Sequence, residues 1–142
     1  MLVRDAMTRD AKVAKPQDTV QAAAELMSEL DVGLLPVGTG DRLVGMITDR
    51  DIAIRAIGKG RGPDTPVAEA MTSDVKYCFE DEDVEAACQS MGDLQVRRLP
   101  VLNRDKRLVG IVSLGDVARS EDASAGAALA QISQPSGEHT QQ

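Results

Sequence analysis

The chain contains an internal duplication, and this feature constrains its fold more than any other. The segment VRDAMTRDAKV, which begins at Val3, recurs as VAEAMTSDVKY from Val67, an offset of 64 residues. After one extra residue in the second copy, Leu43-Val44-Gly45 matches Leu108-Val109-Gly110 at an offset of 65. Chance similarity would not keep such a register, so we predict two copies of one folding unit. Further matched pairs are Val20 with Val84, Ala23 with Ala87, Met27 with Met91, Pro36 with Pro100 and Asp51 with Asp116.

Each copy is predicted to fold in the order β-α-β-β-α. A short extended piece, at Lys12–Ala14 or Val75–Cys78, precedes a helix at Thr19–Leu30 or Asp83–Leu94. Apolar residues recur at every third or fourth position of the first of these helices, which places them on one face. Two short apolar strands with a turn between them follow, and a second helix ends each copy. The strands are expected at Leu34–Val37, Leu43–Thr48, Leu99–Leu102 and Leu108–Ser113, and the closing helices at Asp49–Ile57 and Leu114–Ser120.

The duplication divides the chain into a first repeat over residues 1–57 and a second over residues 67–120. Residues 58–66 lie between them and are dense in Gly and Pro, which is typical of a linker. Residues 121–142 form a tail in which Ala123–Ile132 is a candidate helix, and Gln134–Gln142 is expected to be disordered. Asp18 and Glu82 precede the first helix of each repeat, where capping and the helix dipole favour acids.

Composition narrows the classes of function. The net charge of −7 disfavours nucleic acid as a partner, and with it a transcriptional regulator, because phosphate backbones are bound through cationic surface. No segment approaches the ~20 apolar residues that cross a bilayer. The charged first residues do not resemble a signal peptide. We therefore expect a cytoplasmic protein with no membrane partner, and a core of aliphatic and Met side chains because the chain has one Phe, one Tyr and no Trp.

The residues that usually carry catalysis or bind metal are sparse. Cys78 and Cys88 show neither a disulfide framework nor a metal spacing and are expected to be small buried residues. His139, the single histidine, lies in the tail, which leaves no Ser-His-Asp, Cys-His or histidine-rich metal set. The acidic residues are scattered without a calcium-loop pattern. We predict that the chain is not an enzyme and requires no cofactor and no metal.

Two related motifs, Thr48-x-x-Asp51 and Ser113-x-x-Asp116, stand where a strand turns into the closing helix. A carboxylate in the first turn of a helix can accept hydrogen bonds from two neighbouring hydroxyls, as on a ribose, and a helix start favours phosphate. The same spacing is close to a capping box, which stabilises a helix end with no ligand at all. Both interpretations stay open, and they do not exclude each other.

The stretches GMITDRD, ending at Asp51, and GIVSLGD, ending at Asp116, each follow an apolar-Pro-Val strand and resemble the CBS domain. The resemblance covers about residues 1–120, and the pair resembles a Bateman module of the stand-alone bacterial type. It implies an α/β (α+β) fold of tandem β-α-β-β-α repeats with pseudo-two-fold symmetry. It also implies Asp51 and Asp116 on a ribose, with Thr48 and Ser113 near the ribose or a phosphate.

Basic residues add candidates for the same ligand. Arg97 and Arg98 precede the second Pro-Val strand, and arginine matches phosphate geometry; only one of two adjacent strand residues can face a given cleft. On an acidic protein such arginines are equally expected to be solvated or paired with acids. The first repeat has Gly33-Leu34 at these positions, so we expect one occupied cleft per chain. Further candidates are Arg50 for a phosphate and, on strands that flank the base in the family, Lys12, Val13 and Tyr77, of which Tyr77 stacks on adenine or packs against a helix.

These features predict a non-catalytic regulatory or signalling module that binds an adenosine-containing ligand, of the AMP, ADP or ATP class, in the cleft between the repeats. Binding would shift a conformational population and pass the signal to a protein target that the sequence does not identify. The alternative is a structural protein–protein interaction module with no functional ligand site. The resemblance also implies a homodimer through Ala- and Met-rich helix faces, expected at Ala23, Ala24, Met27, Ala87, Cys88 and Met91.

Overall fold

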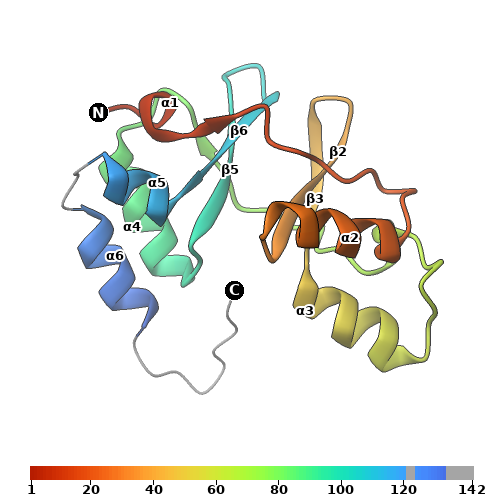
Figure 1. Cartoon of the computed structure of the whole chain (residues 1–142). Helices are drawn as coiled ribbons and strands as arrows, with labels where there is room; N and C mark the ends of the chain where they lie inside the picture. Colours follow the sequence, from red (N-terminus) through yellow and green to blue (C-terminus); the bar gives the residue numbers. More distant parts are fainter. Residues whose placement is uncertain (121–123, 134–142) are drawn as a thin grey trace. The chain divides into compact units, whose positions relative to one another are not determined.

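The computed structural model describes residues 1–120 and 124–133, and these divide into two compact units (Figure 1). Unit 1 combines residues 1–11 with the described residues from 76 onward, and unit 2 comprises residues 12–75. The opening segment of each copy therefore belongs to the unit that the other copy builds. The predicted segment Gln134–Gln142 lies outside the described residues.

Unit 1 contains a four-stranded sheet in the order β1-β6-β5-β4. Strand β6 runs antiparallel to both β1 and β5, whereas β4 runs parallel to β5. Helix α6 lies beside α4 and also contacts α5 (Figure 1). The strands of unit 1 are β1 (Thr8–Arg9), β4 (Cys78–Phe79), β5 (Arg98–Leu102) and β6 (Leu108–Ser113), and its helices are α1 (Val3–Ala6), α4 (Val84–Leu94), α5 (Leu114–Arg119) and α6 (Ser124–Ile132).

Unit 2 repeats this plan with shorter outer strands. Its hairpin pairs β2 (Leu34–Thr39) with β3 (Arg42–Thr48) in antiparallel register. Single bridges stand where unit 1 has β4 and β1: Ala14 pairs in parallel with Val37, and Thr72 pairs antiparallel with Met46. The helical parts of unit 2 are α2 (Val20–Leu30), α3 (Asp49–Asp51), the π-helical turn η1 (Ile52–Ala56), and the 3-10 turns η2 (Ile57–Lys59) and η3 (Val67–Glu69).

The predicted helices and hairpin strands occur, but of the extended pieces Lys12–Ala14 forms only the bridge at Ala14 and Val75–Cys78 reaches a strand only at Cys78. The predicted helix caps are wrong. Thr19 caps α2 by accepting a hydrogen bond from the backbone N–H of Ala22 at 3.0 Å, and Asp83 caps α4 in the same way. Asp18 and Glu82 lie one residue too early for this role. Their carboxylates instead accept hydrogen bonds from backbone N–H groups three residues back, which closes the turn before each helix.

The exchange of opening segments is held by paired backbone hydrogen bonds. In unit 1 the N–H of Val84 donates to the carbonyl of Met1 at 2.9 Å, and in unit 2 the N–H of Val20 donates to that of Thr65 at 2.8 Å. The crossing segments also lie close to the strands beneath them. A Cβ on Gly110 would stand 2.5 Å from the carbonyl oxygen of Thr8, so this position needs glycine.

Each unit has its own aliphatic core. Cys78 and Cys88 are buried in the core of unit 1, as predicted. Burial, with a smaller contribution from the charge of Glu82, raises the pKa of Cys78 to about 12. No helix in the described part of the chain is long and apolar enough to cross a membrane.

The residues predicted to form a dimer face are mostly core residues. Ala87 and Met91 are completely buried within unit 1, and Ala23 is 2% exposed within unit 2. Cys88 and Met27 are also buried, which leaves Ala24 as the exposed member of the six. The prediction is wrong for the other five because each helix turns these small residues toward its own sheet and neighbouring helices.

Candidate functional site

The first motif forms a complete capping box in unit 2. The Thr48 hydroxyl accepts a hydrogen bond from the backbone N–H of Asp51 at 3.0 Å, and the Thr48 N–H donates to Asp51 Oδ2 at 3.0 Å. The other carboxylate oxygen, Oδ1, lies 3.8 Å from Nε of Arg55. Arg55 also donates to the carbonyl of Met71 at 3.2 Å, which holds its guanidinium beside the opening segment of the second repeat.

The second motif repeats this geometry in unit 1. Both hydrogen bonds between Ser113 and Asp116 measure 3.1 Å, and they again join hydroxyl to N–H and N–H to Oδ2. Here Oδ1 of Asp116 accepts a direct hydrogen bond from the guanidinium of Arg119, three residues along the helix. The sequence prediction missed Arg119 and Arg55, although spacings of three and four residues on a helix are the signal for such pairs.

The two carboxylates are fixed in position and only partly shielded. The side chains of Asp51 and Asp116 are 16% and 10% exposed. In each, one oxygen is used by the cap and the other points toward an arginine. The capping interpretation is thus what the geometry shows directly. The second oxygen of Asp116 is also used, by Arg119, whereas that of Asp51 lies 3.8 Å from Arg55.

Arg97 and Arg98 lie beside the second motif. Arg98 stands opposite Ser113 in the β5–β6 ladder, and the carbonyl of Arg97 accepts the N–H of Leu114 at 3.0 Å. Arg97 is exposed and Arg98 is half-buried, and neither forms an ion pair with a carboxylate of residues 1–120 or 124–133. The backbones of Arg97 and Arg98 thus lie beside the start of α5, and Arg119 is the arginine whose side chain contacts Asp116.

The corresponding strand positions in unit 2 carry Gly33 and Leu34 in place of the two arginines. The carbonyl of Gly33 accepts the N–H of Asp49 at 2.9 Å, in the same way that Arg97 accepts that of Leu114. Arg50 is exposed, and its backbone N–H donates to Asp49 Oδ1 at 2.8 Å. The two motifs therefore share their caps and differ in their surroundings, as the sequence predicted from Gly33-Leu34.

The remaining candidates, Lys12, Val13 and Tyr77, have no described contact with the two motifs. Lys12 is exposed, and Val13 is half-buried near Gly38. Tyr77 precedes β4, which β5 separates from β6 and its Ser113. Within unit 2 the fold brings together Thr48, Arg50 and Asp51, and within unit 1 it brings together Arg97, Arg98, Ser113 and Asp116.

Tyr77 belongs to a small aromatic cluster on unit 1. Its ring is 38% exposed and meets Phe79 edge to face, with 5.6 Å between ring centroids. The guanidinium of Arg104 lies 4.1 Å from the Phe79 centroid and donates two hydrogen bonds to Asp81, at 3.0 and 2.9 Å. The hydrogen bonds from Arg104 hold the pKa of Asp81 below its ordinary value. The described contact of Tyr77 is thus with another aromatic ring.

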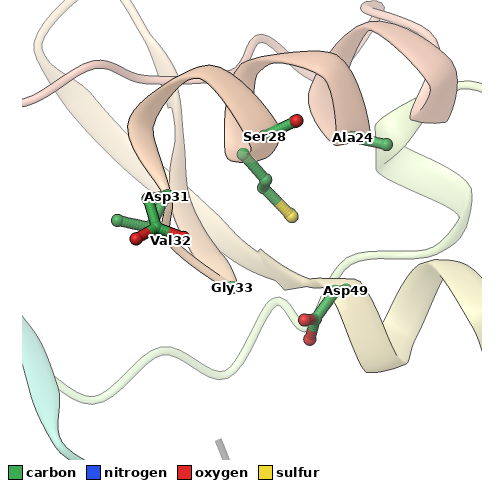
Figure 2. Close-up of a pocket in the computed structure, with 7 residues that line it drawn as sticks. Ala24, Ser28, Asp31, Val32, Gly33 and Asp49 are labelled. Carbon is green, nitrogen blue, oxygen red and sulfur yellow. The ribbon is translucent and has the colours of Figure 1, made fainter.

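Unit 2 also carries a pocket that the sequence did not reveal (Figure 2). It has a volume of about 400 Å³ and lies between the end of α2 and the start of α3. None of the predicted site residues lines it. The lining residues are Ala24, Met27, Ser28, Asp31, Val32, Gly33 and Asp49. Within the described ranges, no three side chains of the His, Cys, Asp and Glu types come together as a metal site.

The repeated fold and the two motifs are those of a known family. The chain belongs to the CBS-domain family, whose pattern matches residues 3–57 and 67–131. The mixed α/β fold with two repeats is confirmed. The CBS domain-containing protein YhcV of Bacillus subtilis is 43% identical over 133 residues, which cover 92% of this chain and 94% of YhcV. Hypoxic response protein 1 of Mycobacterium tuberculosis is 40% identical over 118 residues, 82% of either chain. These relatives consist of little more than the CBS pair.

Solved structures of CBS proteins are similar to this chain in fold. Hypoxic Response Protein I with two coordinated zinc ions is 38% identical, with a TM-score of 0.76, and the match covers 84% of this chain and 98% of that one. CBSX2 in complex with AMP is 31% identical with a TM-score of 0.74, over 84% and 95%. The CBS domain pair of protein MJ0100 in complex with 5-methylthioadenosine and S-adenosyl-L-methionine is 29% identical with a TM-score of 0.73, over 85% and 95%.

Proposed function

We propose that this protein is a non-catalytic, cytoplasmic regulatory module that binds an adenosine-containing ligand of the AMP, ADP or ATP class. The observation that carries the proposal is the repeated Thr/Ser-x-x-Asp turn, in which the cap fixes a carboxylate and uses only one of its two oxygens. Relatives of the same fold bind AMP or S-adenosyl-L-methionine, which supports this ligand class. The protein target that receives the signal is not identified.

The surroundings of the two carboxylates indicate different contributions to binding. Asp51 has the freer oxygen, because its arginine is 3.8 Å away and is also bonded to the Met71 carbonyl. Asp116 accepts a hydrogen bond from Arg119, and Arg98 stands opposite Ser113 of the same motif in the β5–β6 ladder. Carboxylate oxygens accept ribose hydroxyls, and guanidinium groups bind phosphate by paired hydrogen bonds. We therefore expect one strong site per chain, with Arg97 or Arg98 on the phosphate.

Isothermal titration calorimetry with AMP, ADP, ATP, S-adenosylmethionine and NAD tests the proposal. Asp51→Asn and Asp116→Asn are the informative variants, because an asparagine keeps an oxygen for the cap while it removes the charge. Loss of one hydrogen bond to a charged group costs about 1.5–3 kcal/mol, so at least one variant should bind about ten to a hundred times more weakly.

Asp83→Asn is the matched control, since Asp83 also caps a helix but belongs to neither motif. It should leave the affinity unchanged, and melting curves should show that all three variants fold. The proposal fails if the wild type binds none of these ligands, or if both motif variants bind as tightly as the wild type.

The alternative function is a structural interaction module that has no working ligand site. Its supporting observation is that both capping boxes are complete without a ligand. This function predicts no heat of binding from any nucleotide and a single protein partner recovered from the source cell. In either case we propose a homodimer that binds neither nucleic acid nor membrane.

A further inference from the structure

The guanidinium of Arg119 lies on the unit 1 motif, at the place where the proposed ligand would make contact. Its Nη2 donates to Oδ1 of Asp116, the carboxylate oxygen that the cap does not use. A Cβ built on Gly115 would stand 3.5 Å from Nη1 of Arg119 and 3.6 Å from the hydroxyl oxygen of Ser113. These distances place the guanidinium against the first turn of α5, beside the capping hydroxyl.

This contact leaves Asp116 without an unused oxygen. Oδ2 accepts the N–H of Ser113 at 3.1 Å, and Oδ1 accepts the guanidinium of Arg119. The Asp116 side chain is 10% exposed and held by the cap, whereas Arg119 is 74% exposed, so the arginine is the partner that can change position. A hydrogen bond from a guanidinium to a carboxylate is charge-assisted and is stronger than one from a neutral hydroxyl. A ribose hydroxyl must therefore compete with Arg119 for Oδ1.

The motif of unit 2 shows that the cap itself does not need such an arginine. By the repeat register, Arg119 corresponds to Ile54. Arg55, the next residue along, keeps its Nε 3.8 Å from Oδ1 of Asp51, which is too far for a hydrogen bond. The capping box of unit 2 is nevertheless complete, as is that of unit 1. The contact of Arg119 is thus an addition that only the second repeat carries.

A ligand phosphate would give the guanidinium a stronger partner than the carboxylate. Guanidinium groups bind phosphate through paired hydrogen bonds. A phosphate monoester carries a charge of about −1.5 to −2 near neutral pH, compared with −1 on a carboxylate. Arg98 stands opposite Ser113 in the β5–β6 ladder, so a second arginine belongs to the same end of this sheet. Transfer of Arg119 to the phosphate would uncover Oδ1 of Asp116 for the ribose.

We propose that Arg119 determines the ligand specificity of the unit 1 motif. Without a phosphate, its guanidinium holds Oδ1 of Asp116 and competes with a ribose for this oxygen. A nucleotide draws the guanidinium to its phosphate and gains the carboxylate for its ribose. The motif therefore selects a nucleotide over the corresponding nucleoside. This inference rests on the function proposed above and names the residue that sets the class of ligand.

Calorimetry with adenosine, AMP and ATP tests this selection, because the three ligands share the nucleoside and differ in their phosphates. The full chain with Asp51→Asn is the parent, so that binding is measured at the unit 1 motif. In this parent the better nucleotide should bind at least about ten times more tightly than adenosine. Addition of Arg119→Ala should weaken the nucleotide about tenfold, through loss of the phosphate contact. It should strengthen adenosine about two- to fivefold, because the competing surface ion pair is gone.

Arg61→Ala in the same parent is the matched control. Arg61 is also an exposed arginine that pairs with a carboxylate, that of Glu69 at 2.7 Å, and it belongs to neither motif. This variant should leave both affinities unchanged, and with them their ratio. Alanine favours a helix at the exposed position 119, so Arg119→Ala should fold, and melting curves would verify this.

The possible failures separate this inference from the function on which it rests. If the wild type binds a nucleotide but Arg119→Ala keeps the parent's ratio of nucleotide to adenosine affinity, or Arg61→Ala changes that ratio equally, the role of Arg119 is wrong and the proposed function stands. The same conclusion follows if the wild type binds a nucleotide and the Asp51→Asn parent binds none. If the wild type binds neither nucleotides nor adenosine, both proposals are wrong.

Discussion

Units 1 and 2 share a hairpin, the helix before it and the capped helix after it, but only in unit 1 does a further helix, α6, lie over the first helix among the described residues. In unit 1 helix α6 covers α4, so that Met91 beneath it is fully buried. In unit 2 the corresponding Met27 lines an open pocket, and Ile54 and Ile57 are exposed nearby. The difference shows that duplicated sequences retain the residues that build the unit, while the residues that meet a covering helix or a partner diverge.

The Thr48 and Ser113 motifs likewise share one arrangement and differ in another. Both hydrogen bonds of the capping box measure 3.0 Å in unit 2, and both measure 3.1 Å in unit 1. The arginine beside each carboxylate differs, since Arg119 bonds Asp116 directly whereas Arg55 is 3.8 Å from Asp51. The copies thus share the cap that stabilises the start of each closing helix and differ in the arginine contact of its carboxylate.

The largest expected effect comes from the two equivalent methionines, Met27 in unit 2 and Met91 in unit 1. Met91→Ala should cost about 3 to 4 kcal/mol of unfolding free energy, because it leaves a cavity under α6, whereas Met27→Ala should cost about 2 kcal/mol at its open site. Urea denaturation measures both changes. Equal costs would contradict the difference between a covered and an open face.

A second test uses the paired glycines beneath the crossing segments. Gly110→Ala should cost about 2 kcal/mol, because its Cβ would lie 2.5 Å from the backbone oxygen of Thr8, which the β1–β6 pairing holds in place. Gly45→Ala should cost about 1 to 1.5 kcal/mol, since its Cβ would lie 2.6 Å from the movable sulfur of Met71 and 2.9 Å from the backbone oxygen of Thr72, a less severe approach than at Gly110. Met71→Ala should relieve part of the second cost and leave the first unchanged, as followed by urea denaturation.

The smallest expected effect is on the pH dependence of the unfolding free energy. It concerns Cys78 of unit 1, whose equivalent in unit 2 is Ala14. Burial raises the pKa of the Cys78 thiol from 9.0 to about 12, so the folded state favours the protonated thiol. Its stabilising effect is complete below pH 9 and is lost as the pH rises from 9 toward 12. At pH 10 the loss is on the order of 1 kcal/mol.

Cys78→Ala, which copies the residue of unit 2, should remove that dependence. The measurement is the difference in unfolding free energy between wild type and variant at pH 8 and pH 10, which cancels the titration of other groups. A difference that stays constant between these pH values would show that the thiol is not shielded in the fold.

The sequence determined the elements of this protein and their order. Apolar spacing and the repeat register located the first helix of each copy and both hairpins, because these depend on neighbours close in the chain. The closing helix of the first copy was expected to end at Ile57, and helical backbone continues to Lys59. The Thr48 and Ser113 motifs were also found as strand-to-helix turns, since a capping box is a local arrangement.

Only the tertiary structure decided which surfaces are available. The sequence could not place Met1–Ala11 in the unit of the second repeat, because that pairing joins residues more than 70 positions apart, such as Met1 and Val84. Nor could it show that α6 covers one helix face and leaves its counterpart open. Periodicity identifies the apolar side of a helix, but whether a given side chain meets its own core, a covering helix or solvent depends on contacts between distant segments.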